Sequence, residues 1–427
     1  MLDYKLTKFS NGLKLITAPL LNTKAVTVLF LVGVGSRYEK KELNGISHFL
    51  EHMFFKGTEQ RPNTLDISKA LDSVGASYNA FTGEENTGFY VRAASEHFDL
   101  AIDVLSDMLY HSKFDPAEVE REKGVITEEI NMYQDLPQSY ISEVTKSLLF
   151  GDHPLGRETL GSKDTIQKFK RDDFLSYRDK FYSPHNMIVV IAGGRNGADW
   201  EGKTAEIFGS VPVSTGENYE KVKSAQTKPA LLIHHKKTDQ AHMVLGFRSV
   251  PRTDPRRPVL KVLNNLFGEN MSSRLFIEVR ERRGLAYYVG SELGDFRDNG
   301  IFAAGAGVDI ARAEDAVKVI LEEFNKLKNV KVSAEELKRA KENLKGKLYL
   351  YLEESFAVAE FLAEQELFWE RVEDAEKIIA GYEKVTPEEI QQLAKELFTP
   401  ANLNLAMIAP FAEHADKSKF QKILDSY

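Results

Sequence analysis

The sequence contains no cysteine, carries no excess of positive charge and has no long apolar run. Without cysteine, disulfides and thiolate metal sites are excluded, so any bound metal must be held by histidine and carboxylate side chains. The net charge of −8 argues against nucleic acid as the main partner. The longest apolar stretches, such as residues 25–34, are only as long as a strand, which argues against a membrane-spanning helix. The first residues lack the layout of a secretory signal, so we expect a cytoplasmic protein.

The most informative stretch is residues 48–52, which read His48-Phe49-Leu50-Glu51-His52. On a helix, positions i, i+3 and i+4 share one face, so His48, Glu51 and His52 project together. Two imidazoles one turn apart can hold one metal ion, and a carboxylate beside them can take a proton from water. The order H-x-x-E-H inverts the commoner H-E-x-x-H and is typical of inverted zincins. It predicts a metallopeptidase; the alternative is a helix with one buried and one solvated histidine.

A third ligand is needed, because zinc sites usually have three protein ligands or more. The helix expected over residues 115–133 offers several glutamates. Glu122 and Glu129 are seven residues apart and therefore lie on one face, whereas Glu118 and Glu128 point elsewhere. The alternative for these side chains is that they are solvated charges on an amphipathic helix.

The order of strands and helices expected in the first half of the sequence recurs in the second half, which indicates an internal duplication. A strand over residues 76–82 with a hairpin partner over 86–93 has a counterpart in residues 285–290 and 300–305. Each half ends on a further apolar strand, and these final strands are 216 residues apart. The turn at Asn11-Gly12 predicts another hairpin near the beginning of the chain.

This repeat predicts an α+β fold of two homologous domains, each a mostly antiparallel sheet flanked by helices. We place the metal-binding domain at residues 1–212, a polar linker at 213–229 and the second domain at 230–427. Opposite the H-x-x-E-H helix, the second domain has residues 262–268 without a histidine. Because only one of the two copies has these polar residues, we infer that they serve function and not the fold.

Several motifs together resemble the insulinase/pitrilysin family of metallopeptidases, and within it the bacterial members that are similar to mitochondrial processing peptidase. The motifs are His48–His52 with residues 54–58 after it, residues 79–82 with 85–87, residues 125–129, residues 274–276, and residues 280–287. The resemblance extends over nearly the whole chain and departs at no catalytic position.

The resemblance implies a role for each matching residue. His48, His52 and Glu129 would bind one zinc ion per chain, Glu51 would be the general base, and Glu122 would support a ligand histidine from behind. Arg280 and Tyr287 would reach into the active site, where Tyr287, helped by Arg280, would stabilise the oxyanion or hold the adjacent substrate carbonyl. The alternatives for these two are a surface charge and a buried aromatic side chain. Substrate would be added as an extended strand along Ser77, Tyr78, Asn79, Ala80 and Phe81.

The resemblance also implies an architecture. Proteases of this family are clamshells of four related domains that enclose a chamber, so a two-domain chain is half a clamshell. We therefore expect a homodimeric zinc endopeptidase that cleaves unfolded peptides or presequence-like segments, with Arg280 and Tyr287 of one subunit completing the metal site of the other. The alternatives are a non-catalytic core or scaffold subunit, one half of a heterodimeric peptidase, and a peptide-binding protein with a structural metal.

Overall fold

The computed structural model forms two compact units, each built from three stretches of chain. The described residues are 2–195, 197–209, 211–214, 216–411 and 415–427. Unit 1 consists of Met1–Asn131, Glu158–Glu220 and Tyr349–Asp374; unit 2 consists of Met132–Arg157, Lys221–Leu348 and Ala375–Tyr427. Each unit therefore contains sequence from both predicted halves. None of the helices in the described residues is both long and apolar enough to span a bilayer.

Unit 1 is built on a six-stranded sheet with the order β1-β2-β6-β3-β5-β4. Its strands are β1 (Lys5–Lys8), β2 (Lys14–Pro19), β3 (Ala25–Val32), β4 (Ser77–Thr82), β5 (Thr87–Ala94) and β6 (Met187–Gly193). The pair β2–β6 is parallel and the other pairs are antiparallel. Strand β6 is buried along its whole length, because both faces of the sheet are covered there.

Unit 2 is built on a five-stranded sheet with the order β7-β11-β8-β10-β9. Its strands are β7 (Ala230–His235), β8 (Gln240–Ser249), β9 (Ala286–Asp295), β10 (Gly300–Asp309) and β11 (Leu403–Ala409). The pair β7–β11 is parallel, and the remaining pairs are antiparallel. This order repeats β2-β6-β3-β5-β4 of unit 1. The predicted α+β fold with two mostly antiparallel sheets is confirmed.

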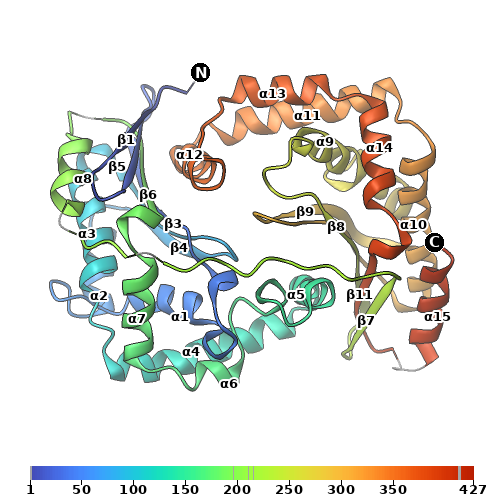
Figure 1. Ribbon diagram of the computed structural model, residues 1–427, viewed down its shortest axis with the longest axis horizontal. Helices are drawn as coiled ribbons and strands as arrows, with labels where there is room; N and C mark the ends of the chain where they lie inside the picture. The colour runs from blue at the N-terminus through green and yellow to red at the C-terminus, as the bar shows by residue number, and fades with distance from the viewer. Residues whose placement is uncertain (1, 196, 210, 215, 412–414) are drawn as a thin grey trace. The chain divides into compact units, whose positions relative to one another are not determined.

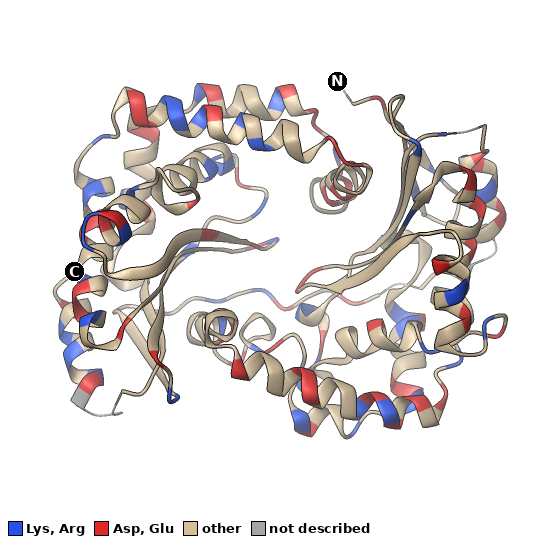
Figure 2. Ribbon diagram, turned by 180° about the vertical axis from the view of Figure 1, so that it is seen from behind, with Lys and Arg blue, Asp and Glu red and all other residues tan. Residues whose placement is uncertain are grey.

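Amphipathic helices cover one face of each sheet. In unit 1 they are α1 (Ile46–Phe54), α2 (Thr64–Asp72), α3 (Phe98–His111), most of α4 (Pro116–Asp135), α6 (Lys163–Ile166), α7 (Arg171–Phe181) and α8 (Trp200–Phe208). In unit 2 they are α9 (Arg257–Gly268), the π-helix η6 (Phe276–Glu281), α10 (Ala313–Asn329), most of α11 (Ala334–Tyr351), α14 (Pro387–Leu397) and α15 (Ala415–Asp425), and α13 (Ala375–Lys384) packs on α9. Along the helices, acidic and basic residues are interspersed (Figure 2).

The other face of each sheet is covered by a helix from the opposite half of the sequence. Helix α12 (Ser355–Trp369) packs Val358, Leu362 and its neighbours on β2, β3 and β6 of unit 1. Helix α5 (Pro137–Phe150) packs Ile141 and Val144 on β8 and β11 of unit 2. Figure 1 shows α12 in orange beside the blue strands of unit 1, and α5 in teal beside β11. We call this arrangement the helix exchange.

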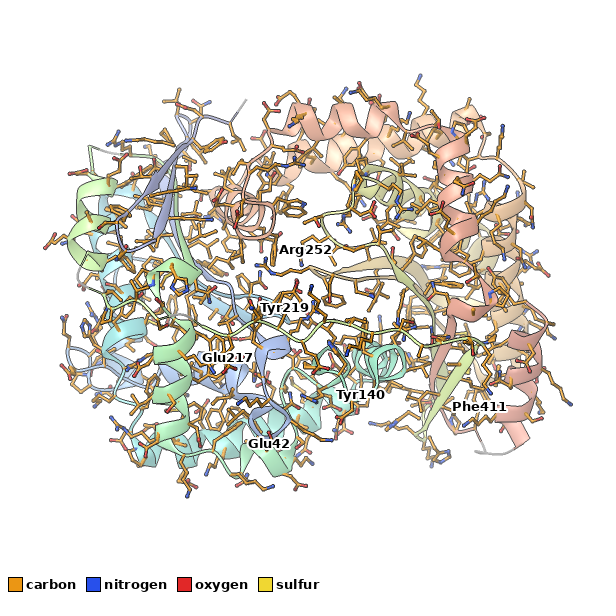
Figure 3. The ribbon with its side chains drawn as sticks, in the orientation of Figure 1. Glu42, Tyr140, Glu217, Tyr219, Arg252 and Phe411 are labelled. Atoms are coloured by element: carbon orange, nitrogen blue, oxygen red, sulfur yellow. The ribbon has the colours of Figure 1, made fainter. Side chains whose placement is uncertain are left out.

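The segment predicted as a linker has no helix or strand in residues 211–214 and 216–229. The change from unit 1 to unit 2 at Glu220 and Lys221 falls inside it. Within unit 1, the Arg37 guanidinium lies 4.1 Å from the centroid of the Tyr219 ring and donates to the carbonyl of Glu220 (2.9 Å). Figure 3 shows Tyr219 on this extended segment. The predicted domain boundaries at 212 and 230 describe the duplication of the sequence, and they stay a prediction. The compact units cannot test them, because the helix exchange makes each unit discontinuous in sequence.

Candidate active site

Helix α1 presents the H-x-x-E-H residues because its opposite face is apolar. Ile46, Phe49, Leu50, Met53 and Phe54 follow the i, i+3, i+4 pattern and are fully buried in the core of unit 1. The polar face is therefore fixed in direction toward α4.

The N-terminus of α1 is capped by a side chain from outside the helix. Its own N-cap, Gly45, has a φ of 98° and no side chain to offer. The buried carboxylate of Glu39 accepts hydrogen bonds from the backbone N–H groups of Gly45 (2.7 Å) and Ser47 (2.8 Å) and from the Asn44 amide (3.1 Å). These contacts satisfy donors that the first turn of a helix leaves open. Burial raises the pKa of Glu39 to about 7.

Helix α4 brings the third member of the candidate metal group. One ligand atom from each of His48, His52 and Glu129 lies within 4.8 Å of the others. The Glu129 carboxylate oxygens are 3.7 Å from His48 Nε2 and 3.4 Å from His52 Nε2. A tetrahedral ion with bonds of ~2.0–2.1 Å separates its ligand atoms by ~3.4 Å. The spacing and the donor types therefore fit a metal ion such as zinc.

The charge states of these three side chains also fit a cation. Burial, with the neighbouring His52 second, lowers the pKa of His48 to about 3, so this imidazole is neutral at ordinary pH, which is the form that binds metals. Burial raises the pKa of Glu129; His52 opposes this and Glu122 adds to it. A positive ion within the group would stabilise the carboxylate.

Glu122 lies behind the group and contacts the second nitrogen of His52. Its Oε1 is 2.8 Å from His52 Nδ1, and its Oε2 is 2.7 Å from the ammonium of Lys56. Burial would raise the pKa of Glu122, but the hydrogen bonds and charges of His52 and Lys56 bring it below its usual value. An ionised carboxylate only accepts, so Nδ1 donates and Nε2 is left to face Glu129.

Glu51 lies on the same helix but outside the three-residue group. Its Oε2 accepts a hydrogen bond from the hydroxyl of Thr82 (2.5 Å) at the end of β4. Burial raises the pKa of Glu51; the Thr82 hydrogen bond and His52 oppose this, and Glu129 adds to it. A carboxylate whose pKa is shifted toward neutrality suits a group that both takes and returns a proton.

Strand β4 contains the five residues predicted to bind substrate, Ser77 to Phe81. It is the last strand of its sheet and pairs, within the described residues, with β5 alone. One of its donors, the N–H of Ala80, is engaged by the side chain of Asn79 (2.9 Å). An edge strand of this kind offers backbone groups to a further strand.

Comparison with known proteins decides the family. The sequence model of the insulinase family, peptidase family M16, matches residues 15–163, and that of the peptidase M16 inactive domain matches residues 168–344. The chain belongs to peptidase family M16. The resemblance inferred from the motifs is thereby confirmed at the level of the family.

Family M16 relatives match along nearly the whole chain. The uncharacterized zinc protease YmxG of Bacillus subtilis is 36% identical over 94% of this chain and 97% of its own length. The uncharacterized zinc protease SCO5738 of Streptomyces coelicolor is 35% identical over 95% and 90%. A protease from Helicobacter pylori shares the fold, with a TM-score of 0.89 at 23% identity over 96% of this chain and all of that one. So does a peptidase M16 inactive domain structure from Pseudomonas fluorescens, with a TM-score of 0.88 at 17% identity over 96% and 98%.

Two residues predicted for the active site lie in unit 2 of this M16 chain. Arg280 is on the π-helix η6 and Tyr287 on β9. The Arg280 guanidinium lies 4.9 Å from the ring centroid of Phe276 and 5.9 Å from that of Tyr287. The alternative that Tyr287 is a buried aromatic is wrong, because this residue is 76% exposed. The structure brings the pair together with each other; their part in catalysis stays a prediction.

Three residues around the metal group were given no role by sequence reasoning. Glu39 caps α1, Lys56 pairs with Glu122, and Thr82 bonds to Glu51. Lys56 follows His52 by four positions, which places it on the same face of the turn that ends α1 and could have indicated it. No local pattern indicates Glu39 or Thr82, since a polar residue before a helix or at a strand end is common.

Proposed function

We propose that the chain is a zinc-dependent endopeptidase that hydrolyses extended peptide segments. The observation that carries this proposal is the grouping of His48, His52 and Glu129 beside Glu51. The printed names of the curated relatives, which call them zinc proteases, support it.

His48, His52 and Glu129 would hold one zinc ion per chain. When bound, zinc polarises a scissile carbonyl and makes water a better nucleophile near neutral pH. Glu51 takes a proton from the attacking water and returns it to the nitrogen of the departing amine, so that one water is consumed for each peptide bond broken. Glu122 holds the His52 ring by its Nδ1 and thereby fixes the tautomer that presents Nε2.

The substrate class follows from the edge strand β4. A peptide that adds to Ser77–Phe81 is held through backbone hydrogen bonds, which require an extended chain and tolerate many sequences. We therefore expect unfolded peptides and presequence-like segments to be cut in preference to folded proteins.

We further propose that the enzyme is a homodimer in which Arg280 and Tyr287 of one copy complete the site of the other. The presence of both residue sets in one chain supports this. Mixing Glu51→Gln with Tyr287→Phe subunits tests it, because a mixed dimer contains one intact site. We expect activity to return on mixing; no recovery with subunits that do exchange would refute completion in trans.

The function itself is tested by cleavage of an unstructured, internally quenched peptide. We expect wild type to cut it, and Glu51→Gln to bind zinc but lose activity. Glu128→Gln is the matched control, because Glu128 is an exposed neighbour of Glu129 and contacts Asn131. A zinc-loaded wild type that cuts nothing would favour the scaffold or the heterodimer alternative.

A further inference from the structure

The strand proposed to receive substrate is joined directly to the proposed base. Thr82 is the last residue of β4, and its hydroxyl donates to Glu51 Oε2 at 2.5 Å. The two residues are 31 positions apart in sequence, so this bond is made by the tertiary fold alone. A threonine hydroxyl has a single hydrogen, and here that hydrogen is given to the carboxylate.

The position of Thr82 is set by the hairpin around it. The ring of Phe81 lies over Gly88 of β5, where a Cβ would come within 2.2 Å of Phe81 Cζ. With the ring in this position, the site has no room for a Cβ, and the ring packs the end of β4 against β5. Thr82 itself is paired with Thr87 in the strand register.

The turn that follows Thr82 is anchored to the rest of unit 1. Gly83 and Glu84 accept backbone hydrogen bonds at their carbonyls from Ser36 (3.2 Å) and Arg37 (2.9 Å). Glu85 is paired with Arg37 at 2.6 Å, and both side chains are buried. Because buried ion pairs with such contacts hold one geometry, the hydroxyl of Thr82 is presented to Glu51 from a rigid support.

We propose that Thr82 is a positioning residue for Glu51 and that it ties the orientation of the base to the edge strand on which the peptide is added. A glutamate side chain has several rotatable bonds, and holding one carboxylate oxygen fixes the direction of the other. Seating a peptide along β4 then acts on the same strand end that orients the base. This inference rests on the proposed function and deepens it.

The test compares Thr82→Val, which keeps the shape and loses the hydroxyl, with Thr82→Ser, which keeps the hydroxyl. A hydrogen bond to an ionised group of this kind predicts a loss of about 10- to 100-fold in kcat for Thr82→Val. We expect KM to change by no more than about twofold, since no interaction with bound peptide is removed. Thr82→Ser should recover most of kcat. Zinc affinity, measured by competition with a chelator, should equal that of wild type in both.

Thr87→Val is the matched control in the same hairpin. Its hydroxyl donates to the Val34 carbonyl (2.8 Å), so its loss should lower thermal stability and leave kcat unchanged. If Thr82→Val does not fold, Thr82→Ala replaces it in the same comparison with Thr82→Ser. Wild-type kcat in Thr82→Val, a loss confined to KM, or a serine variant as slow as valine would each overturn the inference. An inactive wild type, or an active Glu51→Gln, would instead overturn the proposed function.

Discussion

Replacing Glu122 with glutamine should weaken zinc binding without removing a ligand. Glu122 is 1% exposed and bridges His52 Nδ1 (2.8 Å) and Lys56 Nζ (2.7 Å). The amide of Glu122→Gln can still accept from Nδ1, but it has no charge to strengthen the bond or to balance Lys56. Loss of such a carboxylate behind a ligand histidine typically costs 10- to 100-fold in metal affinity, or about 1.4–2.7 kcal/mol.

The assay is a competition titration of the apo protein with a chelator of known zinc affinity near neutral pH. We expect the Kd for zinc to rise about 10- to 100-fold in Glu122→Gln. Glu118→Gln is the control on the same helix, because Glu118 pairs with Arg121 at the surface and should leave the Kd unchanged. Lys56→Met should give a smaller rise, and the double variant should fall short of the sum of the two effects, since both act on one network. A Kd for Glu122→Gln within twofold of wild type would refute the reasoning.

Three further predictions concern stability. Burial raises the pKa of Glu39 from 4.5 to about 7, so its contribution to stability is complete below about pH 4.5 and is lost as the pH rises through 7, by about 3 kcal/mol in all. Glu39→Gln stays neutral, so its Tm should fall less steeply than that of wild type over this pH range. Parallel curves of Tm against pH would contradict this. In a denaturant titration, Gly88→Ala should lower the unfolding free energy by about 1–3 kcal/mol, because the new Cβ meets Phe81. Gly124→Ala should raise it by about 0.5–1 kcal/mol, because Gly124 is in the interior of α4 and a Cβ there meets nothing within 4 Å. Residues 1–212 expressed alone should aggregate, because the sheet face that α12 covers is left bare; a soluble monomer by light scattering would be evidence against it.

The parts of the fold that are local could be predicted. The apolar spacing within residues 46–54 predicted both the helix and the face that carries the histidines, and the Asn11-Gly12 turn lies between two paired strands, as expected. The second sheet was predictable because its strands repeat those of the first. For the helix and the hairpin, the signal lies within a few residues of the feature; for the second sheet, the signal is the repeat itself.

The parts that depend on long-range contacts could not be predicted. The apolar side chains of α5 and α12 show that each helix is buried, but any apolar sheet face would satisfy them, so the helix exchange has no mark in the sequence. The bond between Thr82 and Glu51 and the cap that Glu39 gives to α1 likewise join residues whose own neighbours in sequence say nothing about the partner. The metal group could be predicted because His48 and His52 lie on adjacent turns of one helix.

The helix exchange has a consequence for how a repeated chain is held together. A molecule with only one repeat could cover both faces of its sheet only by swapping a helix with a second molecule. Its folding would then depend on protein concentration. Because both helices belong to one chain, the exchange is intramolecular and depends on an effective local concentration, not on dilution. Each half therefore needs a helix from the other half to complete its fold.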